Sequence, residues 1–267
     1  RVVRLAIPVL LVLVLVIYGL ISSLIAIGVT KSERTQHEDH PSNHNIKFAD
    51  VKFSSRDGNT MISGWYIPGL ITRPSILFVH GIDSNRTGDN ALDLAERLAD
   101  RDYNILMFDL RGHGTSGGTK VSGGYFERQD VLGAYDFLVK LDVPIDSIGV
   151  IGFSMGAGTA IMSLADEPGI GALVADSPYA NLSDLMAQET ANRTVFPKWL
   201  APIFIPGTTL IAKQMYGIDI AELVPEAKVT QLNYPILLIH GAADDRIPFT
   251  HSERIHQSSH PDSTLWL

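Results

Sequence analysis

Residues 148–165 read IGVIGFSMGAGTAIMSLA: an apolar run, a serine between glycines, and then small and apolar residues. The run at 148–152 predicts a buried strand, and 156–165 predicts a helix. Residues 152–156 between them match the pattern G-x-S-x-G. A strand that turns sharply into a helix crowds its turn residue, so only small residues fit on either side. Ser154 is therefore the candidate nucleophile, at a helix N-terminus that favours negative charge.

From residue 47 onward, short apolar runs alternate with helical patterns. Strands are predicted at 48–54, 61–67, 75–79, 104–108, 148–152, 171–175, 236–239 and 264–267, and helices at 90–100, 126–140, 156–165 and 250–257. The first two strands flank the turn sequence RDGN at 56–59 and are expected to form a hairpin. The later alternation predicts an α/β fold with a mostly parallel sheet and helices on both faces. Such sheets bind ligands beyond the carboxyl ends of their strands.

The alternation stops between residues 178 and 233. A structureless loop of that length is unusual inside a compact domain, so this stretch is predicted to be an inserted helical lid. Its larger apolar residues include Trp199, Phe204 and Tyr216. They either line an acyl or aromatic substrate pocket or pack a small subdomain onto the body, and the sequence leaves both readings open.

A serine nucleophile needs hydrogen-bond donors for the oxyanion that forms on its substrate. In a strand–turn–helix arrangement of this kind, the donors are the amide after the serine and an amide after the third strand. Here these are the amides of Met155 and of Ile82, which follows His80 and Gly81. Gly81 permits close backbone approach, and His80 is expected to shape the loop rather than act as a base.

The candidate acid follows a later strand, in the sequence HGAADDRIP at 240–248. Asp244, four residues after His240, is the preferred acid. It would orient a histidine and stabilise the imidazolium without taking its proton. Asp245 is the neighbouring alternative. Asp176, at the end of the preceding strand, is a second alternative, although an aspartate there can equally cap or brace the lid.

A glycine-rich turn, DLRGHGTS at 109–116, also follows a strand. Asp109 and Arg111 are expected to brace this turn through a salt bridge or hydrogen bonds. His113 is then assigned to the structure of the turn rather than to catalysis.

Residues 5–29 carry no charge, and as a helix they are long enough to cross a hydrocarbon core of about 30 Å. A helix that is apolar on every face is unusual in a soluble core. The run is also longer than the roughly 7–15 apolar residues of a signal peptide. An uncleaved membrane anchor is therefore favoured over a signal peptide or a buried helix. Because Arg1 and Arg4 precede the run, the N-terminus is expected in the cytoplasm and the rest of the chain outside.

These patterns divide the chain into an anchor (1–29), a juxtamembrane linker (30–46) and an α/β domain (47–267). The linker is polar and lacks periodicity. Its histidines His37, His40 and His44 are expected to be solvated rather than bound to metal. A formal net charge of −8 gives no basic surface for nucleic acid, and the absence of cysteine excludes disulfides and thiolate metal sites.

Together, His80-Gly81 and the motifs at 109–116, 152–156 and 240–248 resemble the serine-dependent α/β-hydrolase superfamily. The resemblance is strongest to its dienelactone-hydrolase-like and serine-aminopeptidase-like membrane-anchored branch, and it covers residues 47–267. It implies a serine hydrolase that cleaves an ester, thioester or amide of a small-molecule or peptide acyl substrate through an acyl-enzyme, without metal or cofactor. A serine peptidase of the same fold and a non-catalytic binding module stay open as alternatives.

In that superfamily the catalytic histidine follows the last major strand. The predicted strand near 264–267 ends this sequence, so the histidine is expected beyond Leu267, and a chain that stops there is expected to be nearly inactive. His251, His256 and His260 precede the strand and are expected at surface positions.

Overall fold

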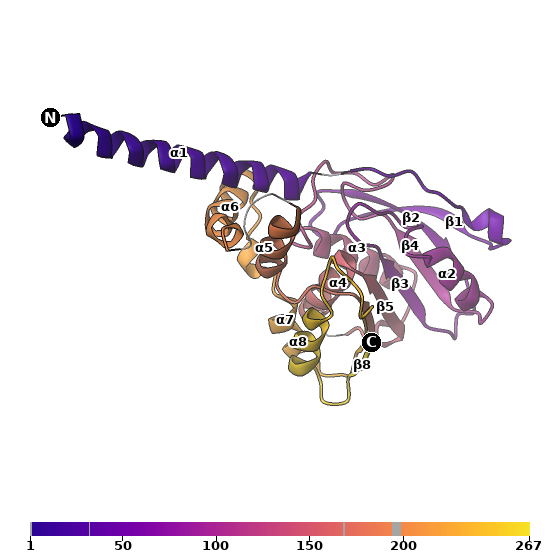
Figure 1. Ribbon diagram of the computed structural model, residues 1–267. Coiled ribbons are helices and arrows are strands. Elements are labelled where there is room, and N and C mark those ends of the chain that lie inside the picture. Colours follow the sequence, from indigo (N-terminus) through magenta and orange to yellow (C-terminus); the bar gives the residue numbers. More distant parts are fainter. Residues whose placement is uncertain (1, 32, 168, 194–198) are drawn as a thin grey trace.

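The computed structural model describes residues 2–31, 33–167, 169–193 and 199–267. Within these residues the centre is an eight-stranded sheet in the order β1-β2-β4-β3-β5-β6-β7-β8 (Figure 1). The strands are β1 (Ala49–Ser54), β2 (Met61–Ile67), β3 (Ser75–Val79), β4 (Asn104–Phe108), β5 (Ile148–Phe153), β6 (Ala172–Asp176), β7 (Leu237–Ile239) and β8 (Thr264–Trp266). β2 pairs antiparallel with β1 and β4, and all other pairs are parallel. The predicted α/β class and mostly parallel sheet are confirmed.

Helices cover both faces of this sheet. The described helices are α1 (Val2–Thr30), α2 (Ala91–Ala99), α3 (Glu127–Lys140), α4 (Met155–Asp166), α5 (Leu182–Arg193), α6 (Ala201–Tyr216), α7 (Pro225–Lys228) and α8 (Thr250–Ser258), with short 3-10 turns η1 (Pro41–His44), η2 (Ile145–Ser147), η3 (Ile220–Glu222) and η4 (Val229–Gln231). Helices α3, α4 and α8 bury Val131, Ile161 and Ile255 in the larger apolar core. Helix α2 buries Leu92 and Ala95 in a second core on the other face.

The predicted lid is helical, as expected. Between β6 and β7 the chain forms α5, α6, η3, α7 and η4, while residues 194–198 of the predicted lid lie outside the described part of the chain. Helices α5 and α6 lie beside the C-terminal half of α1 and away from the strands (Figure 1). The insertion thus joins the sheet to the N-terminal helix.

Helix α1 projects from the body, and its N-terminal half extends beyond every other element in Figure 1. Its stretch Ile7–Thr30 is the one described helix long and apolar enough to cross a membrane, a property that a signal sequence shares. The C-terminal half packs on α6. The Tyr18 hydroxyl donates to the Ile203 carbonyl at 3.0 Å and accepts from the Gly207 amide at 3.0 Å. The Thr208 hydroxyl donates to the Ser22 carbonyl at 3.3 Å.

Candidate active site

Ser154 occupies the turn between β5 and α4. Its φ of 53° and ψ of −120° lie outside the regions that side-chain-bearing residues usually adopt. A Cβ on Gly152 would lie 2.7 Å from the Ala157 Cα, and one on Gly156 would collide with the Val79 carbonyl. The two glycines are therefore required sterically. The strain that Ser154 carries, typically about 1–3 kcal/mol for such a residue, is held by the elements on either side.

Two backbone amides beside Ser154 have no hydrogen-bond acceptor within the part of the chain that the structure describes. Ile82 and Met155 line the same cavity as the serine, and a Cβ on Gly81 would lie 3.2 Å from the Ser154 Cβ. Within the described residues, no acceptor is found for either the Ile82 or the Met155 amide. Unpaired donors next to a serine are what an oxyanion site requires. The structure thus brings together the three residues that the sequence singled out.

The cavity beside Ser154 has a volume of about 430 Å³, which is within the usual range of small-molecule sites. Its walls come from α1, α5, the segment between α6 and η3, and the loops that follow β3, β4, β5, β6 and β7. Most of the lining side chains are apolar, among them Ile25, Val29, Leu185, Met186, Ile218 and Ile220. An apolar group next to the serine hydroxyl is the ligand that this lining favours.

A buried carboxylate fixes one wall of the cavity. Glu127, at the start of α3, accepts hydrogen bonds from the amides of Ser122 and Gly124, each at 2.8 Å, and from the Ser122 hydroxyl. The Tyr179 hydroxyl donates to the Gly123 carbonyl at 2.7 Å. The sequence analysis missed Glu127. The sequence pattern that could have indicated Glu127 is an acidic residue in the first turn of a helix that follows a glycine-rich turn.

Asp244 lies in the loop after β7, and its carboxylate is held by its surroundings. One oxygen accepts from the amides of Arg246 at 3.0 Å and Ile247 at 2.9 Å. The other lies 3.6 Å from Nε2 of His240. Asp245, by contrast, is exposed. Of the two neighbouring aspartates, Asp244 is the one whose orientation the backbone fixes.

Asp176 ends β6 next to the serine turn. Its carbonyl accepts from the Ser154 amide at 2.8 Å, and its carboxylate accepts from the Ser177 hydroxyl at 3.1 Å. Burial raises the pKa of the Asp176 carboxyl above its ordinary value. The contact between Asp176 and Ser154 is thus a backbone contact that holds the turn.

His80 and His113 are buried in loops beside the sheet. His80 Nε2 accepts from the Leu110 amide at 2.9 Å, so Nδ1 carries the proton and donates to the Gly81 carbonyl at 2.7 Å. Burial lowers the pKa of His80 to about 3, which keeps the ring neutral. The His113 ring packs edge-on at 4.9 Å from His80. Among the described residues, no histidine hydrogen bonds to the Ser154 hydroxyl.

The expectation that His251 lies at the surface is wrong, because the residue is only 1% exposed. Its Nδ1 accepts from the Ala180 amide at 3.1 Å, and its Nε2 lies 3.4 Å from the Gln188 side-chain oxygen. Burial lowers the pKa of His251. His251 and Ile255 share the buried face of α8, where the histidine joins this helix to the beginning of the lid.

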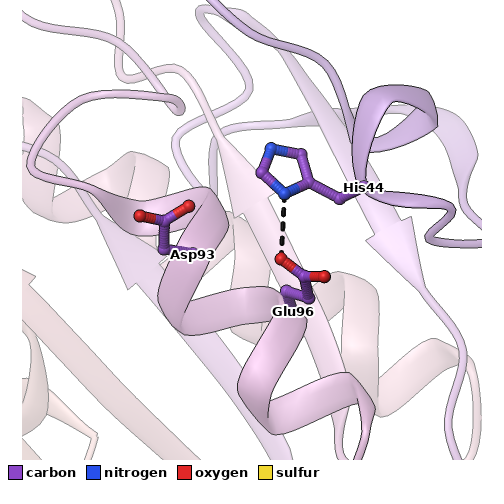
Figure 2. Close-up of side chains that lie close together, drawn as sticks. All are labelled: His44, Asp93 and Glu96. Carbon is purple, nitrogen blue, oxygen red and sulfur yellow. Dashed lines mark hydrogen bonds and ion pairs between the residues drawn. The ribbon is translucent and has the colours of Figure 1, made fainter.

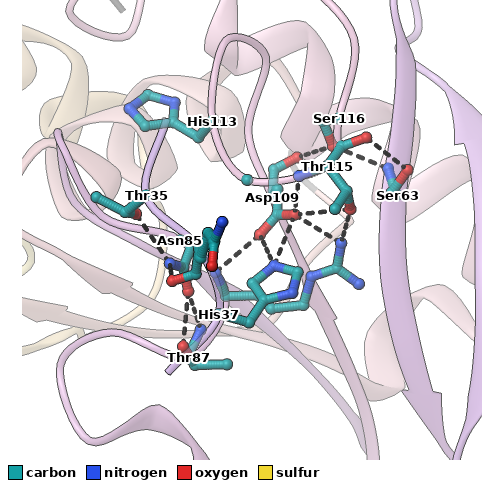
Figure 3. Close-up of polar contacts among 12 residues, drawn as sticks. Thr35, His37, Ser63, Asn85, Thr87, Asp109, His113, Thr115 and Ser116 are labelled. Atoms are coloured by element: carbon teal, nitrogen blue, oxygen red, sulfur yellow. Dashed lines mark hydrogen bonds and ion pairs between the residues drawn. The ribbon is translucent and has the colours of Figure 1, made fainter. Parts of the chain in front are cut away.

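Asp109 and Arg111 brace their turn with separate partners rather than with each other. The buried Asp109 carboxylate binds Arg86 at 2.6 Å and His37 at 3.1 Å (Figure 3), while Arg111 pairs with Asp130 at 2.7 Å. Burial alone would raise the pKa of Asp109. Hydrogen bonds from His37 and Arg86 outweigh burial and hold this pKa below its ordinary value. The sequence analysis missed Arg86 and His37 as partners.

The segment after α1 is docked on the body, which corrects the expectation of a solvated linker. The Arg34 guanidinium donates to four carbonyls of the loop 113–118 at 2.6–3.1 Å. His37 reaches Asp109, and the His40 ring lies 5.0 Å from the Trp65 ring. The Asn85 side chain donates to the Thr35 hydroxyl at 2.9 Å (Figure 3). Polar side chains hold this segment through partners far away in the sequence.

His44, Asp93 and Glu96 offer metal-ligand atoms that lie within 4.8 Å of one another (Figure 2). However, both His44 ring nitrogens are engaged by carboxylates, Nε2 with Asp39 at 2.5 Å and Nδ1 with Glu96 at 2.9 Å. Hydrogen bonds to Asp39 and then to Glu96 raise the pKa of His44 to about 9. The cluster therefore acts as an ion-paired clamp between η1 and α2.

The sequence matches known proteins along most of its length. The uncharacterized protein YqkD of Bacillus subtilis is 29% identical over 77% of this chain and 67% of the relative. The uncharacterized protein YfhR of Escherichia coli K12 is 30% identical over 81% of this chain and 70% of the relative. The lysophosphatidylserine lipase ABHD12 of Danio rerio is 24% identical over 79% of this chain and 54% of the relative.

A solved structure of an esterase has the same fold as this chain. The esterase Pf2001 of Pyrococcus furiosus superposes with a TM-score of 0.70 at 28% identity, covering 88% of each chain. The family described as serine aminopeptidase, S33, matches residues 71–214, which include β3 to β6 and the serine turn. The resemblance inferred from the motifs is thereby confirmed, and the chain belongs to the serine aminopeptidase S33 family of α/β hydrolases.

Proposed function

We propose that this protein is a serine hydrolase that cleaves carboxylic esters, thioesters or amides through an acyl-enzyme intermediate. One observation carries the proposal. Ser154 has a positive φ in a turn at the wall of an apolar cavity, beside two backbone amides for which the described residues offer no acceptor. Such a strained residue at a concave site is characteristic of function rather than of stability.

In the proposed reaction, Ser154 Oγ attacks the substrate carbonyl carbon and its proton passes to a histidine base. The carbonyl oxygen becomes an oxyanion that accepts hydrogen bonds from the Ile82 and Met155 amides. The histidine then protonates the leaving alcohol, thiol or amine as its bond to the carbonyl carbon breaks. A water molecule releases the acyl group from Ser154 by the same two steps.

We further propose that the base is a histidine that follows β8. The carboxyl ends of β7 and β8 are neighbours, with Ile239 opposite Trp266, and Asp244 lies in the loop directly after β7. A histidine after β8 would therefore approach Asp244 on the edge of the sheet that also carries Ser154. The carboxylate of Asp244 would then orient the imidazole; Asp176 and Asp245 are the alternatives that substitution tests.

An ester is the preferred substrate class in this proposal. The cavity lining is mostly apolar, and the similar proteins include an esterase of Pyrococcus furiosus and a lysophosphatidylserine lipase of Danio rerio. A peptidase of the same family would act on aminoacyl arylamides instead. A non-catalytic binding module would turn over neither kind of substrate.

We propose that α1 anchors the protein in a membrane with its N-terminus in the cytoplasm. The length and the continuous apolar surface of the helix support this placement. Because residues 1–267 contain no cysteine, an Asp262→Cys variant adds a thiol at an exposed position, and the protein without this substitution is the labelling control. Labelling of intact cells by a membrane-impermeant maleimide is expected, and labelling only after lysis would contradict the orientation.

Hydrolysis of p-nitrophenyl butyrate by the full-length protein in detergent tests the proposal. Turnover and covalent labelling by a fluorophosphonate are expected for the wild type, and both should be lost in Ser154→Ala. Ser163→Ala, on the same helix but outside the cavity lining, is the matched control and should keep both. A Ser154→Ala variant that retains turnover would rule out the nucleophile. Truncation after Leu267 should abolish turnover, and full activity of that shorter chain would exclude a base after β8.

A further inference from the structure

The cavity that holds Ser154 is walled in part by the N-terminal helix. Residues 25 and 28–31, the last turns of α1 and the residue after it, line this cavity. Ile25 and Val29 pack with Met186 of α5 and with Ile218, just after α6, in one apolar cluster. A helix with the composition of a membrane span is therefore also part of the candidate substrate site.

The length of α1 places its pocket-lining end at a membrane surface. Its 29 residues rise by about 43 Å, whereas a hydrocarbon core is about 30 Å thick and needs about 20 residues. With Arg4 kept outside the core, about 20 residues from position 5 onward fill it, and roughly the last six residues of the helix, 25–30, extend past it. The contact of α1 with the lid begins before this end of the helix, where the Tyr18 ring stacks on Phe204 at 5.4 Å and Ser22 is buried.

Helix α6 presents an apolar surface beside this end of α1. Trp199, just before the helix, and Ile203, Leu210 and Met215 on it are large apolar side chains that are exposed. The single charged residue of α6, Lys213, pairs with Asp219. Exposed apolar side chains on a helix next to a membrane span are typical of an element that lies in the membrane interface.

Four charged residues also line the cavity, and they are Lys31, Asp83, Glu189 and Arg246. Asp83 and Arg246, in loops that follow β3 and β7, pair at 3.8 Å, and both are exposed. Lys31, directly after α1, is exposed as well, and Glu189 on α5 is half-buried. The cavity thus combines an apolar wall shared with α1 and a charged rim in contact with water.

We propose that α1 is a part of the substrate site that selects acyl chain length. The substrate is an amphiphilic ester whose acyl chain leaves the bilayer along α1 and lies against Ile25 and Val29, while its polar head stays at the charged rim. This proposal rests on the proposed function of Ser154, and it makes Ile25 and Val29 specificity-determining residues.

The test compares short-chain and long-chain esters with the full-length protein in detergent. Ile25→Trp and Val29→Trp fill the apolar wall, so kcat/KM for p-nitrophenyl dodecanoate should fall by at least about tenfold, as expected when several methylene contacts are lost. The value for p-nitrophenyl butyrate should fall much less than the value for the dodecanoate. Leu24→Trp, an exposed position on the same helix, is the matched control and should change neither value.

An unchanged dodecanoate value in both tryptophan variants would overturn the proposal. If a tryptophan variant misfolds and loses both activities, the double variant Ile25→Ala/Val29→Ala tests the proposal in its place. It should shift the preference towards longer chains, and an unchanged chain-length profile would overturn the proposal. A wild-type protein without turnover of butyrate, or turnover that survives in Ser154→Ala, would instead reject the proposed function itself.

Discussion

Asp244 and Asp245 are adjacent in the chain, yet the backbone fixes only the first. The amides of Arg246 and Ile247 hold the Asp244 carboxylate, whereas Asp245 is exposed. Asp244→Asn should therefore lower kcat for p-nitrophenyl butyrate by about 10²–10⁴-fold, because an amide cannot hold the base in its working tautomer. Steady-state kinetics of the full-length variants measures this loss.

Two further variants test whether Asp244, rather than Asp245 or Asp176, is the acid. Asp245→Asn should stay within a few-fold of the wild type, since its carboxylate is exposed to water. Asp176→Asn keeps the backbone carbonyl that binds the Ser154 amide, so its effect should be well below that of Asp244→Asn. A larger loss in either of these two variants would transfer the role of the acid to that residue.

At the scale of single residues, the sequence predicted features that are set by local sterics and missed those set by distant partners. Gly152 and Gly156 had to flank Ser154, because a Cβ at either position would collide with neighbouring backbone. His37 and Asp109 are 72 residues apart, and no periodicity links them. Their pairing could be read only from the structure.

At the scale of elements, the docked segment after α1 is held by a clamp that depends on pH. Hydrogen bonds to Asp39 and Glu96 raise the pKa of His44 from its ordinary 6.5 to about 9. The stabilisation from protonated His44 is therefore fully present below about pH 6.5 and is lost as the pH rises through about 9. Thermal unfolding of His44→Gln should show a lower Tm than the wild type at pH 6, and the two values should converge at pH 10.

The partner variant Glu96→Gln serves as the control for this clamp. It removes one of the two carboxylates that bind His44, so it should lower Tm less than His44→Gln does and show the same dependence on pH. A difference in Tm between wild type and His44→Gln that is equal at pH 6 and pH 10 would contradict the clamp.

The regular elements could be predicted because their signals are short-range. The helix expected at 156–165 is α4 (Met155–Asp166), and the strand expected at 104–108 is β4 (Asn104–Phe108). Apolar runs, glycines and turn residues carry that information locally. The docking of residues 33–44 could not be predicted, because Arg34 binds carbonyls of a loop about 80 residues away. A polar segment without periodicity gives no sign of such a distant partner and is therefore expected to be solvated.

At the scale of the whole molecule, the sequence predicted α1 but not the surface on which it rests. A helix that is apolar on every face gives no pattern from which a packing side can be chosen. Gly207 determines the contact between α1 and α6, because it lets the two helices approach closely. A Cβ on Gly207 would lie 2.7 Å from the Tyr18 ring and would collide with Ser22. The small residue on the lid thus determines how the anchor, the lid and the cavity are joined.

The substitution Gly207→Val should push α6 away from α1 without unfolding the sheet. Overpacking of this kind costs about 1–3 kcal/mol, and Gly207 lies outside both cores of the sheet. Since Ile25 and Val29 belong to the displaced helix, kcat/KM for p-nitrophenyl dodecanoate should fall by roughly tenfold, equivalent to about 1.4 kcal/mol, and butyrate turnover should fall much less. Gly19→Val is the matched control, because a Cβ at Gly19 meets nothing within 4 Å. Equal losses on the two esters in Gly207→Val, or a loss of the same size in Gly19→Val, would show that the contact between α1 and α6 does not shape the site.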